Sequence, residues 1–446
     1  MRRTRWVSLA IVIALAFAVT ASAVSGSVAG AQGGKAKLQA TDKGVTDTTI
    51  TITVVAAVDV PGISLFGGVF RGVQAWADYM NATGGIAGRK IKIKTVDSKL
   101  SGDEARNAFI QACDDSFALI GTSVLLLSNF TDLTSCADKA GAVTGIPDFP
   151  VVVTEPAQQC SLTSYAINPA TLDCATKDQH PQTYRANTGP DGYYVKKFGK
   201  LKGAFLYPDP TQSQSAKNSQ VPIFQGEAQR GVATTFERDV SSLATQSEYT
   251  PVAAAIKESG ATYVKSGLAV DSTVKLRKEA KLQGVSGVKV YNCSLQCYDQ
   301  SLLDDGGADV EGQYVYTPFL PFLGKNSEAS QNKLLKAFLK YDKEPDGFGI
   351  QAFAAGILFR DSVEKATGGD NNKLTRKGVL DAVKANHSFD ADGMIGKTDV
   401  GGKVPSPCFI LSQVKGGDFK RISPAKKGTF DCNPKNVVTN KLDLIK

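Results

Sequence analysis

The chain has 446 residues, 42% of them hydrophobic, and a formal net charge of +8 at pH 7. A chain of this length and composition can bury enough apolar surface for two or three lobes of about 100–200 residues each. Its lysines are scattered along the sequence, which is typical of a surface whose charge favours solubility. The lack of a basic cluster argues against nucleic acid as a partner.

The N-terminal segment has the pattern of an export signal. Three arginines precede an apolar run at 7–19, and small residues at 21–23 match a signal-peptidase cleavage site. The run is shorter than the about 20 residues that cross a bilayer, and no cysteine nearby suggests a lipid anchor. We expect a signal peptide over 1–23, a flexible leader over 24–44, and a mature protein exported to the periplasm or the extracellular cell envelope, where cytosolic ATP and nicotinamide cofactors are not supplied.

All eight cysteines lie beyond the predicted signal peptide. An even number in an exported chain favours disulfides, each of which stabilises a short loop by about 2–3 kcal/mol. Pairing of sequence neighbours predicts Cys113–Cys136, Cys160–Cys174, Cys293–Cys297 and Cys408–Cys432. The alternative is a metal or redox site, but the spacing between Cys293 and Cys297 does not fit one, and His180 and His387 are the only histidines that could complete it. We therefore predict structural disulfides and no metal site.

Strand-like and helix-like segments alternate in the first half of the chain. In order, they are a strand at 51–58, a helix at about 67–82, a strand at 90–97, a helix opened by the capping box Ser101–Glu104, a strand at 117–120, a helix through 133–140 and a strand at 150–153. Repeated strand, loop, helix and strand units are typical of a doubly wound parallel sheet.

The same rhythm restarts after an insert at about 156–183 that contains cysteine and proline. The predicted strands are 204–207, 232–236, 261–265 and 288–291, and helices are expected near 219–230, 250–259 and 272–283. Residues 327–386 are mostly helical in pattern, and 407–422 has the pattern of a hairpin that turns at Lys415–Asp418. Two such runs predict an α/β protein with two lobes.

Signatures of enzymes are missing from the sequence. No Gly-x-Ser-x-Gly or His-Glu-x-x-His motif is present, and neither histidine has an obvious nucleophile and carboxylate beside it. The stretch Gly84–Lys90 superficially resembles a phosphate-binding loop, but it follows a helix and lacks a Ser or Thr after the lysine. We predict a turn there, and a protein that is not an enzyme and needs no cofactor.

Candidate binding residues lie in the loops that follow the carboxyl ends of strands, where doubly wound sheets bind ligands. These loops are 61–66, 122–128, 154–158, 208–215, 267–271 and 292–299. Hydroxyl groups and helix-start amides suit a polar or anionic group, and aromatic rings suit an apolar part of a ligand. Residues that carry these groups are Ser64, Phe66, Ser123, Ser128, Thr154, Tyr207 and Tyr291. Each hydroxyl residue has an alternative reading as an N-cap or turn residue, and the convergence of the loops is what favours a pocket.

Several stretches make the chain similar to a known family. They are residues 44–50, the run Tyr79–Lys90 with its Gly-Gly-Ile-x-Gly-Arg pattern, residues 117–121, the turn at 145–147, and residues 252–261 and 280–284. Through these stretches the chain resembles, over roughly 45–432, the solute-binding proteins of ABC importers. Within that group it is most similar to the leucine/isoleucine/valine-binding family, which has the type I periplasmic-binding fold.

This resemblance implies two doubly wound parallel-sheet lobes joined by a three-strand hinge. The crossovers are expected near 184–188, 313–318 and 389–398. They divide the chain into lobe one, formed by 45–185 and 318–390, and lobe two, formed by 186–317 and 391–446.

The resemblance also implies a ligand site between the lobes. First-lobe hydroxyls and amides hold an amino-acid carboxylate in similar proteins, a role that falls here on Ser123–Ser128 and Val153–Thr154. The second-lobe candidates are Gly267, Leu268, Asp271, Tyr291 and Asn292. The sequence departs from the amino-acid pattern, because the loop at 122–128 is apolar and Tyr291-Asn292-Cys293 stands where an ammonium-binding acid is expected. A neutral, carboxylated or aromatic small molecule is therefore an alternative to an amino acid.

These observations predict a monomeric solute-binding protein that closes on a small polar or amphipathic molecule of the amino-acid, amide or carboxylate class. It would deliver this solute to the transmembrane permease subunits of an ABC importer. One alternative is a ligand-sensing receptor subunit with the same fold, which shares the same pocket physics. The other is a secreted hydrolase, which the two isolated histidines disfavour.

Overall fold

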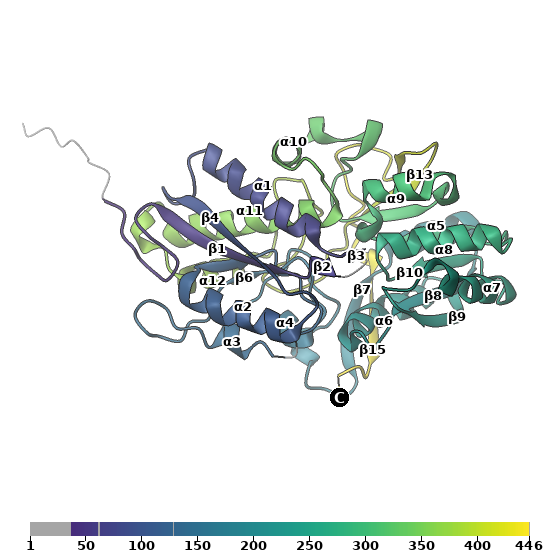
Figure 1. Ribbon diagram of the computed structural model, residues 1–446, viewed down its shortest axis with the longest axis horizontal. Coiled ribbons are helices and arrows are strands. Elements are labelled where there is room, and N and C mark those ends of the chain that lie inside the picture. Colours follow the sequence, from purple (N-terminus) through teal and green to yellow (C-terminus); the bar gives the residue numbers. More distant parts are fainter. Residues whose placement is uncertain (1–36, 61–62, 128, 446) are drawn as a thin grey trace, which may run out of the picture. The chain divides into compact units, whose positions relative to one another are not determined.

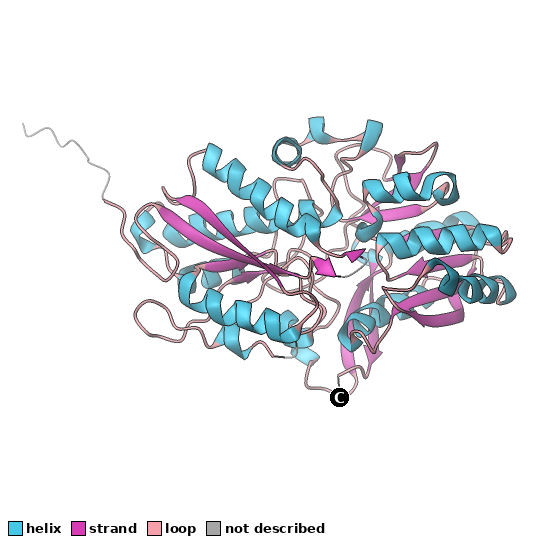
Figure 2. Cartoon of the chain, viewed as in Figure 1, coloured by secondary structure: helices cyan, strands magenta, loops and turns pink. Residues whose placement is uncertain are grey.

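The computed structural model describes residues 37–60, 63–127 and 129–445, and the elements below belong to the unit formed by residues 38–446. Parallel strands form two separate sheets with helices packed around each (Figure 1, Figure 2). The predicted fold class, mixed α/β with parallel sheets, is confirmed. None of the helices in this described part has both the length and the apolarity needed to cross a membrane.

The first sheet is parallel throughout and has the strand order β4-β1-β5-β6. Its strands are β1 (Thr49–Ala56), β4 (Lys90–Asp97), β5 (Ala118–Ile120) and β6 (Asp148–Phe149). The central strand β1 buries Ile52, Val54 and Val55 completely, which explains its nearly continuous apolar sequence. A short antiparallel pair, β2 (Asp59–Val60) and β3 (Ile63–Ser64), follows β1.

The helices around the first sheet come from two distant parts of the sequence. The first part supplies α1 (Gly67–Ala82), α2 (Gly102–Asp115), α3 (Thr131–Thr134) and α4 (Pro156–Gln159). The second part supplies α10 (Lys333–Tyr341), α11 (Gly347–Thr367) and α12 (Arg376–Lys384). As the capping box predicts, Ser101 caps α2, and its Oγ accepts a hydrogen bond from the Glu104 amide at 3.3 Å.

Helices α1 and α11 pack against each other closely because glycine stands at their contact points (Figure 1). A Cβ atom on Gly72 would lie 2.1 Å from the carbonyl oxygen of Gly349. On the other helix, a Cβ on Gly356 would lie 2.3 Å from the ring of Trp76, which is fully buried. The core of this half therefore depends on backbone contact that no larger residue permits.

The second sheet has seven strands in the order β14-β13-β12-β11-β10-β8-β9. They are β8 (Leu201–Pro208), β9 (Val232–Val240), β10 (Tyr263–Ser266), β11 (Val290–Cys293), β12 (Tyr314–Thr317), β13 (Ile410–Val414) and β14 (Phe419–Ser423). The five strands β8 to β12 pair in parallel, and β13 and β14 add an antiparallel hairpin. Its turn is closed by the amide of Lys415 and the carbonyl of Asp418 at 2.9 Å, as predicted.

Five helices accompany the second sheet. They are α5 (Gly189–Phe198), α6 (Gln214–Ala228), α7 (Thr250–Glu258), α8 (Val270–Leu282) and α9 (Gln300–Gly306). Helices α6, α7 and α8 confirm the predicted segments, whereas α5 and α9 had no counterpart in the sequence prediction. Both are short, and α5 carries two glycines and a proline in its first turn, so its helical pattern is weak.

A separate two-stranded sheet joins β7 (Gln182–Asn187) to β15 (Val437–Leu442) in antiparallel register. Two isolated bridges, Phe319 with Ile395 and Phe389 with Thr398, tie together the segments that follow β12 and α12. The three predicted crossovers fall on β7, β12 and this bridged segment. The division of the chain into two lobes at these points stays a prediction.

All four predicted disulfides are present: Cys113–Cys136, Cys160–Cys174, Cys293–Cys297 and Cys408–Cys432. The described residues hold no free cysteine. They also contain no group of three or more His, Cys, Asp and Glu side chains arranged to hold a metal ion.

The predicted helix through 133–140 is wrong beyond Thr134, where α3 ends. The chain turns back instead, because the Cys136 carbonyl accepts hydrogen bonds from the amides of Thr144 at 3.1 Å and Gly145 at 2.9 Å. The predicted strand at 150–153 is also displaced: β6 ends at Phe149, and Val152 makes only an isolated bridge to Ser123. Both differences arise where tertiary contacts override local sequence pattern.

The predicted signal peptide at 1–23 and residues 24–36 of the predicted leader lie outside the described residues. The last part of that leader is packed against the fold. Asp42 is buried, and its carboxylate accepts hydrogen bonds from the amides of Arg376 at 2.7 Å and Lys139 at 3.2 Å.

The close α1–α11 contact predicts a large cost for Gly72→Ala. The added methyl group has to displace the α11 backbone, so we expect the free energy of unfolding to fall by about 1–3 kcal/mol. The matched control is Gly192→Ala in α5, where a Cβ meets no atom within 4 Å and alanine favours the helix. Urea denaturation of both variants tests this, and equal midpoints for the two would contradict it.

Candidate functional site

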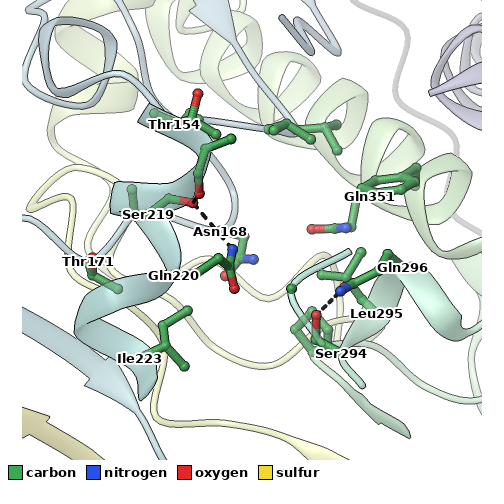
Figure 3. Close-up of a pocket in the computed structure, with 18 of the residues that line it drawn as sticks. Thr154, Asn168, Thr171, Ser219, Gln220, Ile223, Ser294, Leu295, Gln296 and Gln351 are labelled. Carbon is green, nitrogen blue, oxygen red and sulfur yellow. Dashed lines mark hydrogen bonds between the residues drawn. The ribbon is translucent and has the colours of Figure 1, made fainter. Parts of the chain in front are cut away.

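A cavity of about 350 Å³ lies between the two large sheets and is the candidate ligand site (Figure 3). Val151–Thr154 reach it after β6, Gly267–Ala269 after β10 and Ser294–Gln296 after β11. The carboxyl ends of parallel strands from both sheets therefore face one gap, the place where open α/β sheets bind ligands. Helices α6 and α11 complete the wall with residues such as Ile223 and Phe348.

The lining of this cavity is uncharged. No Asp, Glu, Lys, Arg or His stands among the described residues that line it. Apolar side chains dominate, and the polar groups are hydroxyls and amides from Thr154, Asn168, Thr171, Asn187, Ser219, Gln220, Ser242, Ser294, Gln296, Tyr316, Gln351 and Ser406. Such a lining favours an apolar or amphipathic molecule oriented by a few hydrogen bonds.

Carboxamide side chains approach the cavity from different elements, as Figure 3 shows for Gln220, Gln296 and Gln351. The Nε2 of Gln220 donates to Ser219 Oγ at 3.3 Å. The Nε2 of Gln296 donates to the Leu268 carbonyl at 3.4 Å, and its Oε1 accepts from Ser294 Oγ. Gln220 and Gln296 are thus oriented by neighbours on the second-sheet side.

Glycine at position 267 makes room for the Gln220 side chain. A Cβ there would lie 2.9 Å from Gln220 Cγ and 3.1 Å from its Cδ. Any larger residue would push the Gln220 amide away from its present position. Gly267 therefore leaves room for the Gln220 side chain, while its own role in ligand binding stays a prediction.

The start of α11 is fixed by Asp346, which caps the helix. Its Oδ1 accepts hydrogen bonds from the amides of Phe348 at 2.9 Å and Gly349 at 2.7 Å, and Arg71 Nη2 lies 2.7 Å from Oδ2. Burial raises the pKa of Asp346 to about 6, against the backbone hydrogen bond and Arg71, which lower it. This cap places Phe348 and Gln351, one turn apart, against the cavity.

Two hydrogen bonds cross from α6 to loops on the first-sheet side. Ser213, the N-cap of α6, donates through Oγ to the Leu125 carbonyl at 3.0 Å. Ser215 Oγ lies 3.5 Å from Thr154 Oγ1. The two halves thus touch directly beside the cavity.

A second cavity, of about 360 Å³, shares lining residues Leu125, Thr154 and Ser219 with the first. Leu444 and Ile445 line it as well, next to the carboxyl-bearing Glu155. Burial raises the pKa of Glu155. The candidate ligand site therefore adjoins a second cavity, which differs from it in having a titratable group in its lining.

Five of the twelve predicted site residues line the main cavity: Phe66, Val153, Thr154, Gly267 and Leu268. They come from both sheets, as expected for loops at the carboxyl ends of strands. Ser128 and the side chain of Ser64 lie outside the described parts of the chain. The roles of the five lining residues in ligand binding stay predictions.

The structure does not bring the other five predicted residues to the cavity. Ser123 is buried and donates to the Gly121 carbonyl at 3.0 Å. Tyr207 turns the other way, packing on Phe224 with ring centroids 4.7 Å apart and donating to Glu237 at 3.0 Å. Ser123 follows β5 and Tyr207 lies near the end of β8, but both side chains are buried away from the cavity.

Asp271, Tyr291 and Asn292 are likewise engaged elsewhere. Asp271 pairs with Lys275 at 3.1 Å along the surface of α8. The guanidinium of Arg277 lies 3.9 Å from the ring centroid of Tyr291. Asn292 is buried in a polar network of the second half.

Sequence reasoning missed the glutamines and Asn168. Gln351 had a usable signal, because it is the one polar residue in the apolar stretch Gly349–Phe359 at the start of a buried helix. Gln220 lies on α6 nearly two turns past the loop that follows β8, where the strand-end pattern carries no signal. Asn168 belongs to the irregular insert, whose course has no local pattern.

A buried charge network lies directly behind the cavity wall. The ammonium of Lys265 pairs with Glu227, and both side chains are almost fully buried. Asp191 lies in the same core and accepts from Tyr263 Oη at 2.8 Å. Lys265 Nζ also lies 5.3 Å from the ring centroid of Tyr316, which lines the cavity. The network therefore supports the wall without exposing a charge to the ligand space.

This network buries two carboxyl groups, Glu227 and Asp191, with the single ammonium of Lys265, so a carboxyl proton is retained to unusually high pH. Burial and the neighbouring Asp191 raise the pKa of Glu227 from 4.5 to about 8, and Lys265 opposes the rise. Burial likewise raises the pKa of Asp191. Between pH 4.5 and about pH 8, the folded state therefore binds more protons than the unfolded state. The free energy of unfolding consequently falls as the pH rises through this range.

We predict that Glu227→Gln flattens this dependence. Glutamine mimics the protonated acid, so the wild-type chain should lose about 3–4 kcal/mol more unfolding free energy than the variant between about pH 5 and about pH 8. Glu258→Gln, on the exposed end of α7, is the matched control and should follow the wild type. Denaturant titrations across the pH range measure this, and parallel curves for all three proteins would show that Glu227 does not titrate there.

Comparison with known proteins shows which family model the chain matches. Residues 49–418 match the family model described as periplasmic binding protein. No curated protein sequence matches the chain.

Solved structures with the same fold include a leucine-binding protein from Thermotoga maritima, 19% identical, with a TM-score of 0.61 over 84% of this chain and 98% of the other. A fatty acid ABC transporter substrate-binding protein from Thermomonospora curvata is 18% identical, with a TM-score of 0.65 over 88% and 95%. A solute-binding protein from R. palustris in complex with benzoate is 16% identical, with a TM-score of 0.62 over 85% and 99%.

Proposed function

Because this chain belongs to the periplasmic binding protein family, we propose that it captures a small molecule between its two halves outside the cytoplasmic membrane. It then delivers the solute to the permease subunits of an ABC importer. Four disulfides support an extracytoplasmic location. Binding without catalysis is consistent with His180 and His387, which pair with Asp443 and Asp399 and do not line the cavity.

The observation that carries the proposal is the uncharged cavity lined by both halves. Its volume of about 350 Å³ suits a small molecule. A zwitterionic amino acid needs an anion for its ammonium group, and the described lining offers none. The structural neighbours are named for leucine, fatty acid and benzoate, so the fold accommodates several solute classes. Here the lining favours an amphipathic or neutral solute over an amino acid.

The proposed mechanism is hinge closure. Lobe one is formed by 45–185 and 318–390, and lobe two by 186–317 and 391–446, with the hinge at the segments around β7, β12 and 389–398. A solute in the cavity contacts both lobes, so its binding shifts the population toward the closed state. Apolar residues such as Ile223 and Phe348 provide affinity through burial, while the amides orient the polar group.

A thermal-shift screen of L-leucine, benzoate, octanoate and their primary amides tests the proposal. A compound present at 100 times its Kd stabilises the protein by about 2.7 kcal/mol. The titration is then repeated with Phe348→Ala from the first-sheet side and Ile223→Ala from the second-sheet side. Each variant should weaken binding about tenfold, because each loses apolar contact with the solute.

The matched control is Leu282→Ala at the end of α8, a residue that is 73% exposed and does not line the cavity. It should bind as the wild type does. If only one of the two variants, Phe348→Ala or Ile223→Ala, weakened binding of a solute, this result would contradict closure of both halves around that solute. Chemical turnover of any compound in the screen would contradict a purely binding role.

A further inference from the structure

Gln351 has a buried carbonyl oxygen without a partner. The side chain is 2% exposed, and its Nε2 donates to the Gly347 carbonyl at 3.2 Å. Its Oε1 has no hydrogen-bond partner among the described residues. Gln351 lines the main cavity and extends toward its centre in Figure 3. A buried acceptor left unpaired is costly, and here the missing donor would have to come from the cavity.

The orientation of this amide is determined by chemistry. The Gly347 carbonyl can only accept, so the NH₂ end of Gln351 must face it. Exchanging the two ends of the amide would bring two acceptors together. The oxygen therefore faces the ligand space as an acceptor.

The residues around Gln351 Oε1 favour an uncharged ligand group as its hydrogen-bond donor. Phe348, Leu295 and Phe66 line the same cavity, and no charged side chain does so in the described chain. An ammonium donor would lack a counter-anion, and a carboxylate would set its own acceptors against Oε1. We propose that Gln351 is a specificity-determining residue that selects neutral solutes bearing an N–H or O–H donor, such as amides or alcohols, over carboxylates and zwitterions.

This inference rests on the proposed solute-binding function and names the class of solute for the same cavity. It assigns a binding role to a residue outside the loops that follow the strands. The expected discrimination is about 10- to 100-fold, which corresponds to one unmade hydrogen bond in a buried site.

Matched pairs of compounds test the inference. Benzamide is compared with benzoate, and octanamide and 1-octanol with octanoate, by calorimetric titration of the folded wild-type protein. The amide or alcohol should bind at least about tenfold more tightly than the carboxylate of the same pair. The titrations are run at neutral pH, where both acids are ionised.

The variant Gln351→Met keeps the shape of the side chain and removes the acceptor. It should weaken binding of the neutral member about tenfold and leave binding of the carboxylate unchanged or tighter, because the opposing acceptor is gone, so that the discrimination is largely lost. The matched control is Gln313→Met. Gln313 is also buried with an unpaired Oε1, and it donates to the Tyr291 and Tyr314 carbonyls at 3.0 and 3.1 Å, but it does not line the cavity. This control should retain the wild-type discrimination, whatever its own stability.

The outcomes separate the inference from the proposed function. If a carboxylate binds as tightly as its neutral partner, or if Gln351→Met keeps the discrimination, the selective role of Gln351 is wrong while solute capture stands. If none of these compounds binds, the neutral class is wrong as well. The proposed function fails on different evidence, namely a confirmed solute that depends on one half alone or is chemically converted.

Discussion

The structure depends on two parallel sheets that direct the carboxyl ends of their strands toward one gap. Strand β6 on one side and β10 and β11 on the other all end there, and the loops after them form the cavity wall. The ends of parallel strands and the helices that follow them supply oriented backbone groups without adding charge. An apolar cavity with a few fixed polar groups follows from this arrangement, provided that charged side chains are kept out of it.

Buried charges are indeed held away from the cavity by other partners. The guanidinium of Arg89 donates to the carbonyls of Thr46, Ala87, Gln39 and Asn371 at 2.7–3.0 Å, which ties the turn after α1 to distant segments. This explains why an arginine follows the Gly-Gly-Ile-x-Gly turn in the sequence.

Two other arginines are also held by several acceptors, although the buried Nε of Arg376 has no hydrogen-bond partner within the part of the chain that is described. Arg376 donates to the carbonyls of Cys113, Ser116 and Ala137 at 2.5–3.1 Å. Arg421 pairs with Glu328 through two contacts of 2.5 and 2.6 Å. Because each cation meets several acceptors, its burial is compensated, and it serves as a link between chain segments.

Much of the fold could be predicted from the sequence because its segments carry strong periodic patterns. Helix α1 and strand β4 occur at the predicted residues, since apolar spacing and the glycines after α1 define them. The disulfides followed from sequence neighbours because each closes a short loop. Strand β15 was missed because its partner, β7, lies some 250 residues earlier and no local signal reports such pairing.

The candidate site was predictable only at the level of loops. Strand ends identify the edge of the sheet, which is why Val153, Thr154, Gly267 and Leu268 reach the cavity. They do not say which way a side chain turns, and Tyr207 turns into the core to pack on Phe224. Residues delivered by helices, such as Gln351, depend on how a helix from the far end of the chain docks, and that is a tertiary property.

The direct contacts between the two halves bear on the proposed closure. Ser213 bonds the Leu125 carbonyl, and Ser215 lies near Thr154. A hydrogen bond of this kind contributes about 1 kcal/mol net, so these contacts can stabilise a closed form by an amount similar to the few kcal/mol that separate two conformers. In the proposed mechanism, a solute that fills the cavity and pairs with Gln351 adds free energy available only when both halves meet. Under this proposal, the solute controls the balance between open and closed forms.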